Sequence, residues 1–344
     1  MNSTQVLVQE ALPEGWEDFV SAHPEHTLYH TGRWNEMVRQ VFRHPVYYVV
    51  AKQGNQWTGV VPLTVFRSRL FGCFAVASPY VNYGGPLLHT DCQVHPLAES
   101  LHRFRIQQKL NHIELRCQQA DMLPLPAKQH KVTFLLPLPE ESDQLWKSFK
   151  AKVRSQVRRP GKEGMYARVG RNDLLEAFYR VFSTNMRDLG TPVYSRKFFQ
   201  AILEYFPEQS WIVVVFTREG EPAAASFLLA YNQRMEIPWA SSIRKFNRFS
   251  PNMLLYWQSM KLAIEQGCRL FDFGRCTPGT GTYRFKKQWG AQEKPLYWYY
   301  AQDGDALPEL SPQNPKYELA IRLWSRLPVP VTRLLGPPII RQIP

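Results

Sequence analysis

Two segments far apart in the chain share one pattern of apolar and polar positions. Apolar residues dominate 47–51 and 60–66, which lie on either side of a polar turn. The same pattern returns at 211–216 and 223–231. Short runs rich in Val, Tyr and Phe that flank a polar turn are typical of β-hairpins. We therefore predict two hairpins whose starting positions differ by about 160 residues (211 minus 47).

Each predicted hairpin is followed by the same three elements. A third strand, a helix and a buried strand are expected at 72–79, 94–109 and 112–117 in the first half, and at 235–241, 251–266 and 270–275 in the second. A helical connection brings the chain back to the same sheet. We predict an α/β (α+β) fold of two tandem domains, each a mixed, mostly antiparallel sheet in which the last strand lies beside the third.

Prolines and charge runs set the predicted domain limits. Prolines cluster between the two repeats, where they punctuate the chain. We predict a first domain at 5–140, a second domain at 141–306 and a proline-rich tail at 307–344. Further helices are expected at 13–22, 32–41, 142–159, 173–187 and about 315–326, and a strand at 165–169. Pro160 and Gly161 are expected to end the helix at 142–159.

The charge of the chain favours an anionic partner. There are 42 Lys and Arg against 29 Asp and Glu, a net charge of +13. The excess is greatest at 147–171, where nine basic residues accompany only Glu163. Arg154 and Arg158 are four apart on one face of the predicted helix, so we expect them to bind a phosphate-bearing substrate by bidentate hydrogen bonds. A solvated basic helix face is the alternative.

Other features argue against several classes of protein. The five cysteines are never closer than eight residues, which fits neither a disulfide framework nor a CxxC zinc site. The nine histidines lack metal spacing such as HExxH, so we expect no metal site. No run of eighteen apolar residues occurs, and the first residues lack the pattern of a secretory signal. We therefore expect a cytoplasmic protein.

Three motifs resemble those of one family. They are Asp272-Phe273-Gly274 followed by Thr282 to Gly290, the basic segment Lys152 to Gly164, and Tyr83-Gly84-Gly85-Pro86. With the duplicated order of elements, they resemble the FemAB family of tandem Gcn-five-related N-acetyltransferase (GNAT)-like domains. The resemblance covers about residues 5–300. More narrowly, it points to the FemAB-like proteins found with exosortase (PEP-CTERM) exopolysaccharide systems.

The resemblance implies an activity and residue roles. Members of the FemAB family are aminoacyl or peptidyl transferases that extend a nucleotide- or lipid-linked cell-wall (peptidoglycan) precursor, with aminoacyl-tRNA as donor. The family pattern gives Lys286 the role of stabilising transition-state charge, with Phe285 packed beside the donor. Trp34, with Arg33, is similar to a precursor-binding aromatic of the first domain, and Tyr83 lies in the glycine-proline turn.

The residues themselves add further candidates. Asp272 lies between two phenylalanines on a predicted inner strand, where its carboxylate could act as a base, orient the acceptor amine, or form a structural pair near Arg275. Arg187 is a second candidate for a diphosphate contact, with Tyr194 able to stack or hydrogen-bond. A solvated surface or core role is the alternative for each.

The donor and the functional class stay open. We expect no tightly bound cofactor, but an activated acyl donor as co-substrate, either aminoacyl-tRNA or acyl-CoA. The chain shows no tRNA-contacting helical insertion, and it lacks the glycine-rich pyrophosphate loop of acetyl-CoA-dependent members. An acyl-CoA- or acyl-carrier-dependent transferase acting on a sugar amine is therefore the first alternative. A non-catalytic nucleic-acid-binding protein is the second, because the positive charge alone would allow it.

The tail has its own amphipathic pattern. Leu319, Leu323 and Trp324 fall on one face of the predicted helix, with Arg322 and Arg326 to one side. An apolar stripe flanked by arginine suits peripheral docking on an anionic inner membrane leaflet. The alternative is that the stripe folds back onto the sheet of the second domain.

Overall fold

A computed structural model describes residues 4–69, 71–304 and 318–344. The chain divides into two compact units. Unit 1 comprises the described residues of 1–132, 295–308 and 341–344, and unit 2 those of 133–294 and 309–340. The first part of the predicted tail, 307–317, lies outside the described residues. The predicted limit after residue 140 and the observed division after residue 132 differ by eight residues.

Unit 1 is built around an antiparallel hairpin, as the sequence predicts. Its sheet has the order β1-β2-β3-β4-β6-β13, and β4 pairs with β6 in parallel. The last strand of the predicted repeat therefore lies beside the third. The elements are β1 (Thr4–Gln9), α1 (Trp16–Ala22), a 3-10 turn (Leu28–His30), α2 (Gly32–Phe42), β2 (Val46–Gln53), β3 (Gln56–Ser68), β4 (Gly72–Val76), β5 (Leu87–Leu88), α3 (Val94–Gln107) and β6 (His112–Cys117).

Both faces of the unit 1 sheet are covered by helices. Because side chains alternate along a strand, neighbours such as Val49 and Val50 of β2 enter different cores. Val49 packs in the cluster that contains Leu101 of α3, and Val50 packs with Trp16 of α1. This explains why the strands read as continuous apolar runs rather than as alternating ones.

Unit 2 repeats the arrangement. Its strand order is β7-β12-β11-β10-β9-β8, and β11 pairs with β12 in parallel. The elements are β7 (Ala127–Pro137), α4 (Ser142–Ser148), α5 (Ala151–Lys162), β8 (Tyr166–Gly170), a 3-10 turn (Asn172–Leu174), α6 (Leu175–Asp188), α7 (Arg196–Tyr205), β9 (Ser210–Phe216), β10 (Pro222–Tyr231), β11 (Arg234–Ser242), a 3-10 helix (Arg244–Phe249), α8 (Pro251–Glu265), β12 (Leu270–Asp272) and α9 (Gly281–Lys287). β13 (Gln292–Gln302) follows, and its residues from 295 onward belong to unit 1.

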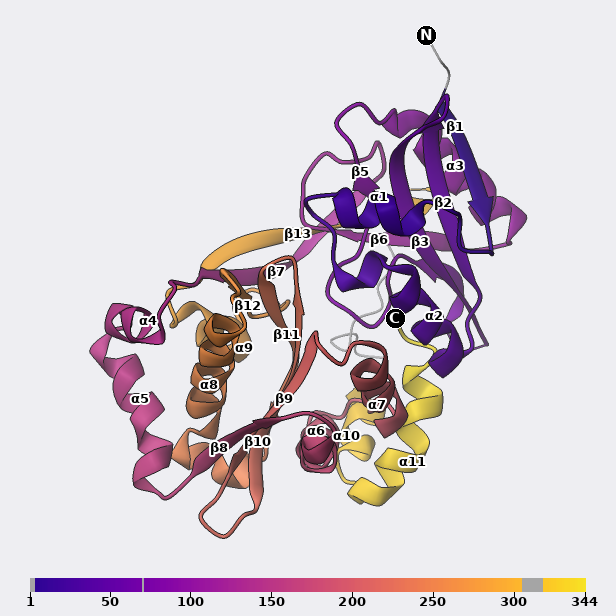
Figure 1. Cartoon of the computed structure of the whole chain (residues 1–344). Helices are drawn as coiled ribbons and strands as arrows, with labels where there is room; N and C mark the ends of the chain where they lie inside the picture. Colours follow the sequence, from indigo (N-terminus) through magenta and orange to yellow (C-terminus); the bar gives the residue numbers. More distant parts are fainter. Residues whose placement is uncertain (1–3, 70, 305–317) are drawn as a thin grey trace. The chain divides into compact units, whose positions relative to one another are not determined.

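The sheet of unit 2 lies between two groups of helices (Figure 1). α8, with α5 beside it, covers one face, and α6 covers the other. The predicted α/β fold with a mostly antiparallel sheet in each half is thus confirmed. Strands β7 and β13 each contain residues of both units. This is why the prolines near residue 137 do not mark the division: one of them ends a strand instead of a domain.

The basic segment forms two helices, and the prediction of one helix at 142–159 is wrong. α4 ends at Ser148, where Phe149 and Lys150 are extended, and α5 begins at Ala151. Pro160 does not end α5 but lies inside its last turn. The helix ends at Lys162, and Gly164 two residues later has a φ of 73°, in the left-handed region that favours glycine.

Two helices of the tail pack on unit 2. These are α10 (Glu318–Trp324) and α11 (Val329–Ile340). Arg187 Nη1 of α6 donates to the Leu327 carbonyl at 3.1 Å, and Arg333 Nε of α11 donates to Ser183 Oγ at 2.9 Å. The tail therefore folds back, but onto helix α6 rather than directly onto the sheet. α11 was not predicted, because prolines 330, 337 and 338 obscure its helical pattern.

Gly190 provides a test of this packing. Its φ is 70°, and an added Cβ would lie 2.4 Å from Ile321 Cγ2 and 2.7 Å from the Ile321 carbonyl oxygen. We expect Gly190→Ala to lower the free energy of unfolding by about 2 to 3 kcal/mol, because strain and a backbone clash add. Gly220→Ala is the control, since Gly220 has a φ of 81° but nothing within 4 Å. It should lose only about 1 kcal/mol in urea denaturation. Equal losses would contradict the docking of α10.

Candidate active site

Buried charged side chains meet where β11 and β12 run in parallel. Glu236 of β11 is paired in register with Asp272 of β12, and both are 0% exposed. Lys286 of α9 is 4% exposed. Thr280 caps α9, because its side chain accepts a hydrogen bond from the Tyr283 N–H. That cap sets where α9 begins and so which of its side chains faces inward.

The ammonium group of Lys286 is hydrogen-bonded to backbone carbonyls of unit 2. Its Nζ donates to the carbonyl oxygens of Gly274 at 2.6 Å and Arg275 at 3.0 Å. Burial lowers the pKa of Lys286 to about 8, although Cys276, Asp272 and Glu236 counteract this by their charge. The ammonium is thus a fixed cation at neutral pH. Lys287, the next residue, is exposed, with its Nζ 5.6 Å from the centre of the Tyr283 ring.

The carboxylate of Asp272 binds the N–H of Gly274, the residue whose carbonyl binds Lys286. Its Oδ1 accepts hydrogen bonds from Thr133 Oγ1 at 2.7 Å and from the Gly274 N–H at 2.9 Å. Arg234 Nη1 lies 3.6 Å from Oδ2. Burial raises the pKa of Asp272 to about 7, partly offset by the Gly274 hydrogen bond and the charge of Lys286. Both protonation states are therefore accessible near neutrality.

The peptide groups of Gly274 join these two side chains. The Gly274 N–H bonds to Asp272 and its carbonyl to Lys286, while its φ of 69° is in the left-handed region. A non-glycine residue would be strained there. The buried carboxyl and ammonium groups thus fix the turn that leads into the exposed loop around Pro278 and Gly279.

Phe285 belongs to an aromatic cluster. Its ring centre lies 4.8 Å from that of Tyr256 on α8 and 6.3 Å from that of Trp289. Tyr256 in turn stacks on Phe273, which follows β12. The structure therefore brings Phe285, Lys286 and Asp272 together in unit 2. The role of Phe285 beside a donor stays a prediction.

The predicted phosphate ligands have partners within the chain. Arg154 Nη1 donates to the carbonyls of Lys147 and Phe149, at the end of α4. The Arg158 guanidinium lies 5.1 Å from the centre of the Trp146 ring and is exposed. Arg187 binds Asp188 as well as Leu327. Their phosphate roles stay predictions, and of the three Arg158 is the best placed for an external ligand.

The remaining predicted substrate-binding residues differ in burial and in their contacts. Tyr194 is half-buried, stacks on Phe182, and accepts a hydrogen bond from Tyr179 Oη through its carbonyl. In unit 1, Trp34 is fully buried against Tyr29, whereas its neighbour Arg33 on α2 is exposed. Tyr83 is buried in the same unit. Substrate contacts by these residues stay predictions.

Unit 1 contains a buried polar network that sequence reasoning missed. Arg116 Nε donates to Glu114 Oε1 at 2.7 Å, and Tyr300 Oη donates to Glu114 Oε2 at 3.1 Å. The Arg116 guanidinium also lies 4.5 Å from the centre of the Trp298 ring. The signal was alternation: His112, Glu114 and Arg116 occupy every second position of β6 and so share one face.

Glu114 and Asp272 occupy matching positions in the two repeats. Each is the third paired residue of the strand that follows the repeat's helix, opposite Val76 and Glu236 respectively. In unit 1 the carboxylate is bound by Arg116. In unit 2 the corresponding region contains the Lys286 ammonium, and Glu236 accepts a hydrogen bond from Tyr231 Oη at 3.3 Å.

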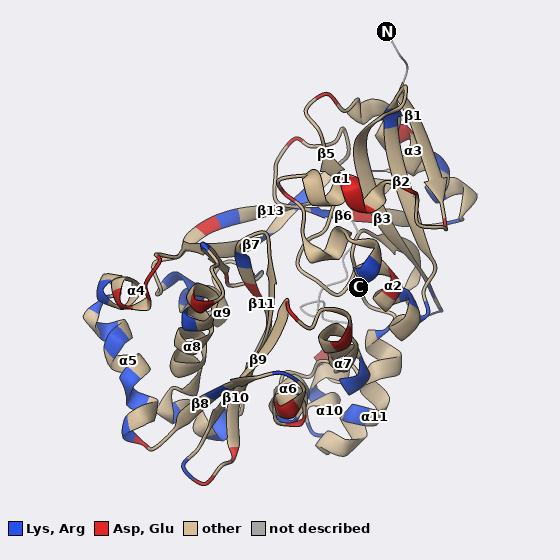
Figure 2. Ribbon diagram, viewed as in Figure 1, with Lys and Arg blue, Asp and Glu red and all other residues tan. Residues whose placement is uncertain are grey.

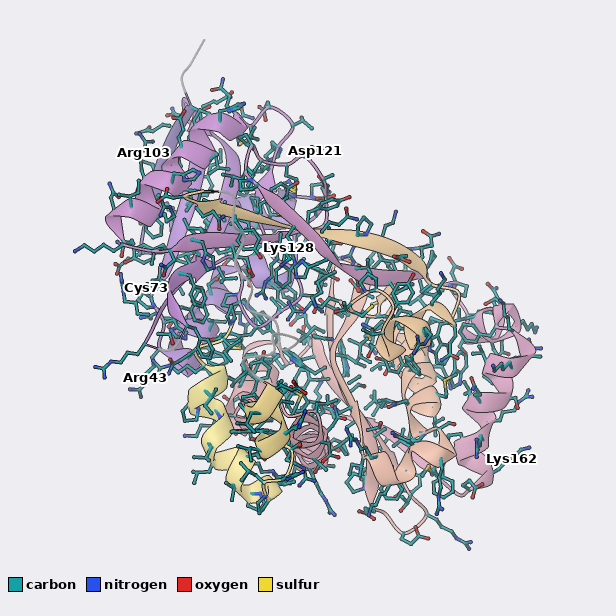
Figure 3. All side chains as sticks on the ribbon, turned by 180° about the vertical axis from the view of Figure 1, so that it is seen from behind. Arg43, Cys73, Arg103, Asp121, Lys128 and Lys162 are labelled. Carbon is teal, nitrogen blue, oxygen red and sulfur yellow. The ribbon has the colours of Figure 1, made fainter. Side chains whose placement is uncertain are left out.

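Exposed cations on unit 2 offer places for an anionic ligand. Figure 2 shows Lys and Arg along the length of α5, and Lys162 lies at its carboxyl end (Figure 3). Lys152, Arg158, Arg159 and Lys162 are exposed there. A second exposed set, Arg244, Lys245 and Arg248, precedes α8. Among the residues that the structure describes, no group of His, Cys, Asp and Glu could hold a metal ion.

Replacing Lys286 tests its place in the interior. Lys286→Ala would leave two buried carbonyls without a donor and create a cavity, so we expect a loss of about 3 kcal/mol in the free energy of unfolding. Lys287→Ala removes the same charge from an exposed site and should change stability by less than about 0.5 kcal/mol. Equal urea midpoints for the two variants would show that Lys286 is not held in the core.

The pKa of Asp272 predicts a dependence of stability on pH. An unfolded aspartate has a pKa near 3.9, roughly three units below the folded value. Between about pH 4 and 7, the folded state holds a proton that the unfolded state has lost, so this group's contribution falls as pH rises. The difference in unfolding free energy between the wild type and Asp272→Asn should therefore fall by up to about 1.4 kcal/mol per pH unit. Parallel curves from pH 4 to 7 would contradict the raised pKa.

Comparisons with known proteins agree with this fold. A family model described as an acetyltransferase (GNAT) domain matches residues 147–287, which include β11, α8, β12 and all of α9. No curated protein sequence matches the chain significantly. Solved structures do resemble it.

Three solved structures are similar over most of the chain. FemX has a TM-score of 0.65 at 15% identity, over 92% of this chain and 100% of its own. L-PGS from Bacillus licheniformis has a TM-score of 0.59 at 15% identity, over 95% and 98%. The C-terminal domain of a putative lysylphosphatidylglycerol synthetase from Agrobacterium fabrum has a TM-score of 0.54 at 12% identity, over 84% and 91%.

These likenesses confirm the fold predicted from the repeated order of elements. The identities are low, so the shared feature is the arrangement of elements. The chain has the arrangement of elements found in FemX and L-PGS, and its residues 147–287 match the acetyltransferase (GNAT) family model, which supports its resemblance to the FemAB family.

Proposed function

We propose that this protein is an N-acyltransferase of the aminoacyl- or peptidyl-transferase kind, which acts on an anionic nucleotide- or lipid-linked precursor of the cell envelope or of an exopolysaccharide. An acceptor amine attacks the carbonyl carbon of an activated acyl group. The new C–N bond forms, the C–O or C–S bond to the donor breaks, the amine loses a proton and the leaving group gains one. Neither a metal nor a redox cofactor is needed to balance this reaction.

One observation carries the proposal. The buried Glu236, Asp272 and Lys286 lie on β11, β12 and α9 respectively, all within the segment that matches the GNAT model. Charged groups are costly to bury, so their presence in a core favours a functional constraint. Around them, the parallel pair β11 and β12 is joined by α8, whose N-terminus carries a partial positive charge.

The roles of Lys286 and Asp272 follow from their contacts. Lys286 supplies a fixed positive charge beneath the Gly274–Arg275 turn, and Asp272 orients that turn from the other side. We infer that they are positioning residues: they hold the backbone of the turn against which the acyl carbonyl is presented. A preorganised turn keeps its dipoles aligned as charge develops on the oxyanion.

Exposed cations support an anionic substrate. The four on α5 are accompanied in that helix by no acidic residue. One similar structure is titled a putative lysylphosphatidylglycerol synthetase, a name that refers to an aminoacylated phospholipid. A phosphate-bearing acceptor would meet the positive charge of unit 2 before the reacting amine is placed.

Two donor classes have separate support. The match to an acetyltransferase domain favours an acyl-CoA or acyl-carrier thioester. The likeness to FemX and L-PGS and the family motifs favour aminoacyl-tRNA. Both donors bring phosphate groups, so the basic residues before α8 fit either.

The activity can be tested with the full chain. Purified protein is incubated with aminoacyl-tRNA or with a panel of acyl-CoA thioesters, and with UDP-linked or lipid-linked precursors that carry a free amine. Mass spectrometry should find an amide product whose mass equals acceptor plus acyl group minus one proton. Lys286→Ala should lower kcat by about 10²-fold or more at a temperature where circular dichroism shows it folded. Lys287→Ala is the matched control and should keep its rate.

Two results would contradict the proposal. One is the absence of product with every pairing of donor and acceptor, combined with no thermal stabilisation by any of them. The other is an unchanged rate for folded Lys286→Ala. Tight retention on nucleic acid without any transfer would favour the non-catalytic alternative.

A further inference from the structure

The outward face of α11 is apolar. Its exposed positions are Pro330, Val331, Leu334, Leu335 and Pro338, which recur with helical spacing along one side. Leu334 is 76% exposed. A surface helix of a globular protein normally turns polar residues to solvent. On α11, apolar residues face the solvent instead.

The inward face of α11 is the more polar one. Thr332, Gly336 and, at the end of the helix, Ile340 are buried. Arg333 donates to Ser183 on α6, and its guanidinium lies 5.1 Å from the centre of the Tyr179 ring. An added Cβ at Gly336 would lie 2.8 Å from the Val193 N, so the helix backbone already lies tight against unit 2. These contacts fix the orientation of α11, and the apolar face cannot turn inward without breaking them.

The preceding helix adds to this surface. Leu319, which is 69% exposed, and Leu323 are one turn apart on α10. Of the ten large exposed hydrophobic residues in the described part of the chain, five lie between 318 and 340. Leu189 is a sixth nearby, since Gly190 contacts Ile321 of α10. Isolated exposed leucines are ordinary, but this concentration marks an interaction surface.

The charges around these leucines are positive. Arg322 and Arg326 are exposed, and the one acidic residue of the two helices, Glu318, is paired with Arg322 at 2.5 Å. With Arg333, residues 318–340 carry three arginines and one glutamate, a net charge of +2. Figure 2 shows that the remainder of α10 and α11 is uncharged.

We propose that the outward faces of α10 and α11 dock on the surface of an anionic lipid bilayer. Leucine side chains enter the boundary between headgroups and acyl chains, while the arginines contact lipid phosphates. No described helix is long and apolar enough to cross a membrane. A second copy of the chain fits less well, because self-association would bring like-charged arginines together in a protein that already carries +13.

This surface would deepen the proposed function by favouring lipid-linked acceptors over nucleotide-linked ones. That step rests on the proposed transferase activity, whereas the docking itself does not. Binding to vesicles can therefore be measured without any acyl transfer, and the two proposals can fail separately.

The experiment is sedimentation of the full-length protein with vesicles of phosphatidylglycerol and phosphatidylcholine, compared with phosphatidylcholine alone. We expect binding to the anionic vesicles that weakens as salt increases. Leu334→Glu/Leu335→Glu should reduce it by at least about tenfold, because two apolar side chains that would insert into the bilayer surface are replaced by anions. Ile106→Glu in unit 1 is the control: this residue is 64% exposed and lies on α3, so its variant should bind like the wild type. Arg322→Ala/Arg326→Ala should lower the preference for anionic lipid.

Three outcomes would overturn the proposal. The first is no sedimentation with anionic vesicles, and the second is equal binding by the wild type and the Leu334→Glu/Leu335→Glu variant when both have the same circular dichroism spectrum. The third is a concentration-dependent dimer, seen by light scattering, that this variant abolishes while vesicle binding is absent. That result would assign the face to a second copy of the chain.

Discussion

A buried ammonium group constrains unit 2 more than any other single feature. Removing a charge from water costs several kcal/mol unless partners replace the hydration. Lys286 obtains two of them from consecutive carbonyls, at Gly274 and Arg275, and both groups are available only if the chain turns sharply after β12. The left-handed Gly274 makes that turn, and Asp272 binds its N–H. The end of β12, the turn and α9 are therefore determined together.

The two units place a buried carboxylate at the same position of the fold but surround it differently. In each unit, a helix returns the chain so that a short strand pairs in parallel, and a buried carboxylate ends up at the third paired position. In unit 1, Arg116 donates a hydrogen bond to one carboxylate oxygen of Glu114 and Tyr300 donates one to the other. In unit 2, Arg234 Nη1 lies 3.6 Å from Asp272 Oδ2, and burial raises the pKa of this carboxyl to about 7. The first arrangement is suited to stability and the second to titration near neutrality.

Sequence alone predicted the repeated order and most of its elements, because strands such as β9 and helices such as α3 carry strong local patterns. It missed β13, whose pairing partner β6 lies about 180 residues away, since no local pattern reveals a distant partner. It predicted Lys286 as a site residue through the family resemblance, and Asp272 from its position between two phenylalanines on a predicted inner strand. It could not show that both side chains are buried. It also could not show that Arg154 donates hydrogen bonds to carbonyls at the end of α4, because these contacts depend on a helix break at Phe149 that no glycine or proline marks.

Lys286 is a buried cation coupled to Asp272, and titration of the Lys286 ammonium group measures this coupling most directly. The full-length protein, labelled with carbon-13 at lysine Cε, can be followed by NMR from pH 6 to 11, and the signal missing from Lys286→Arg identifies the residue. The structure predicts a midpoint near pH 8, separated from the exposed lysines, with a shift in that midpoint when Asp272 is replaced by Asn. A midpoint above 10, unchanged in Asp272→Asn, would show that the ammonium is solvated and that the turn is held by something else.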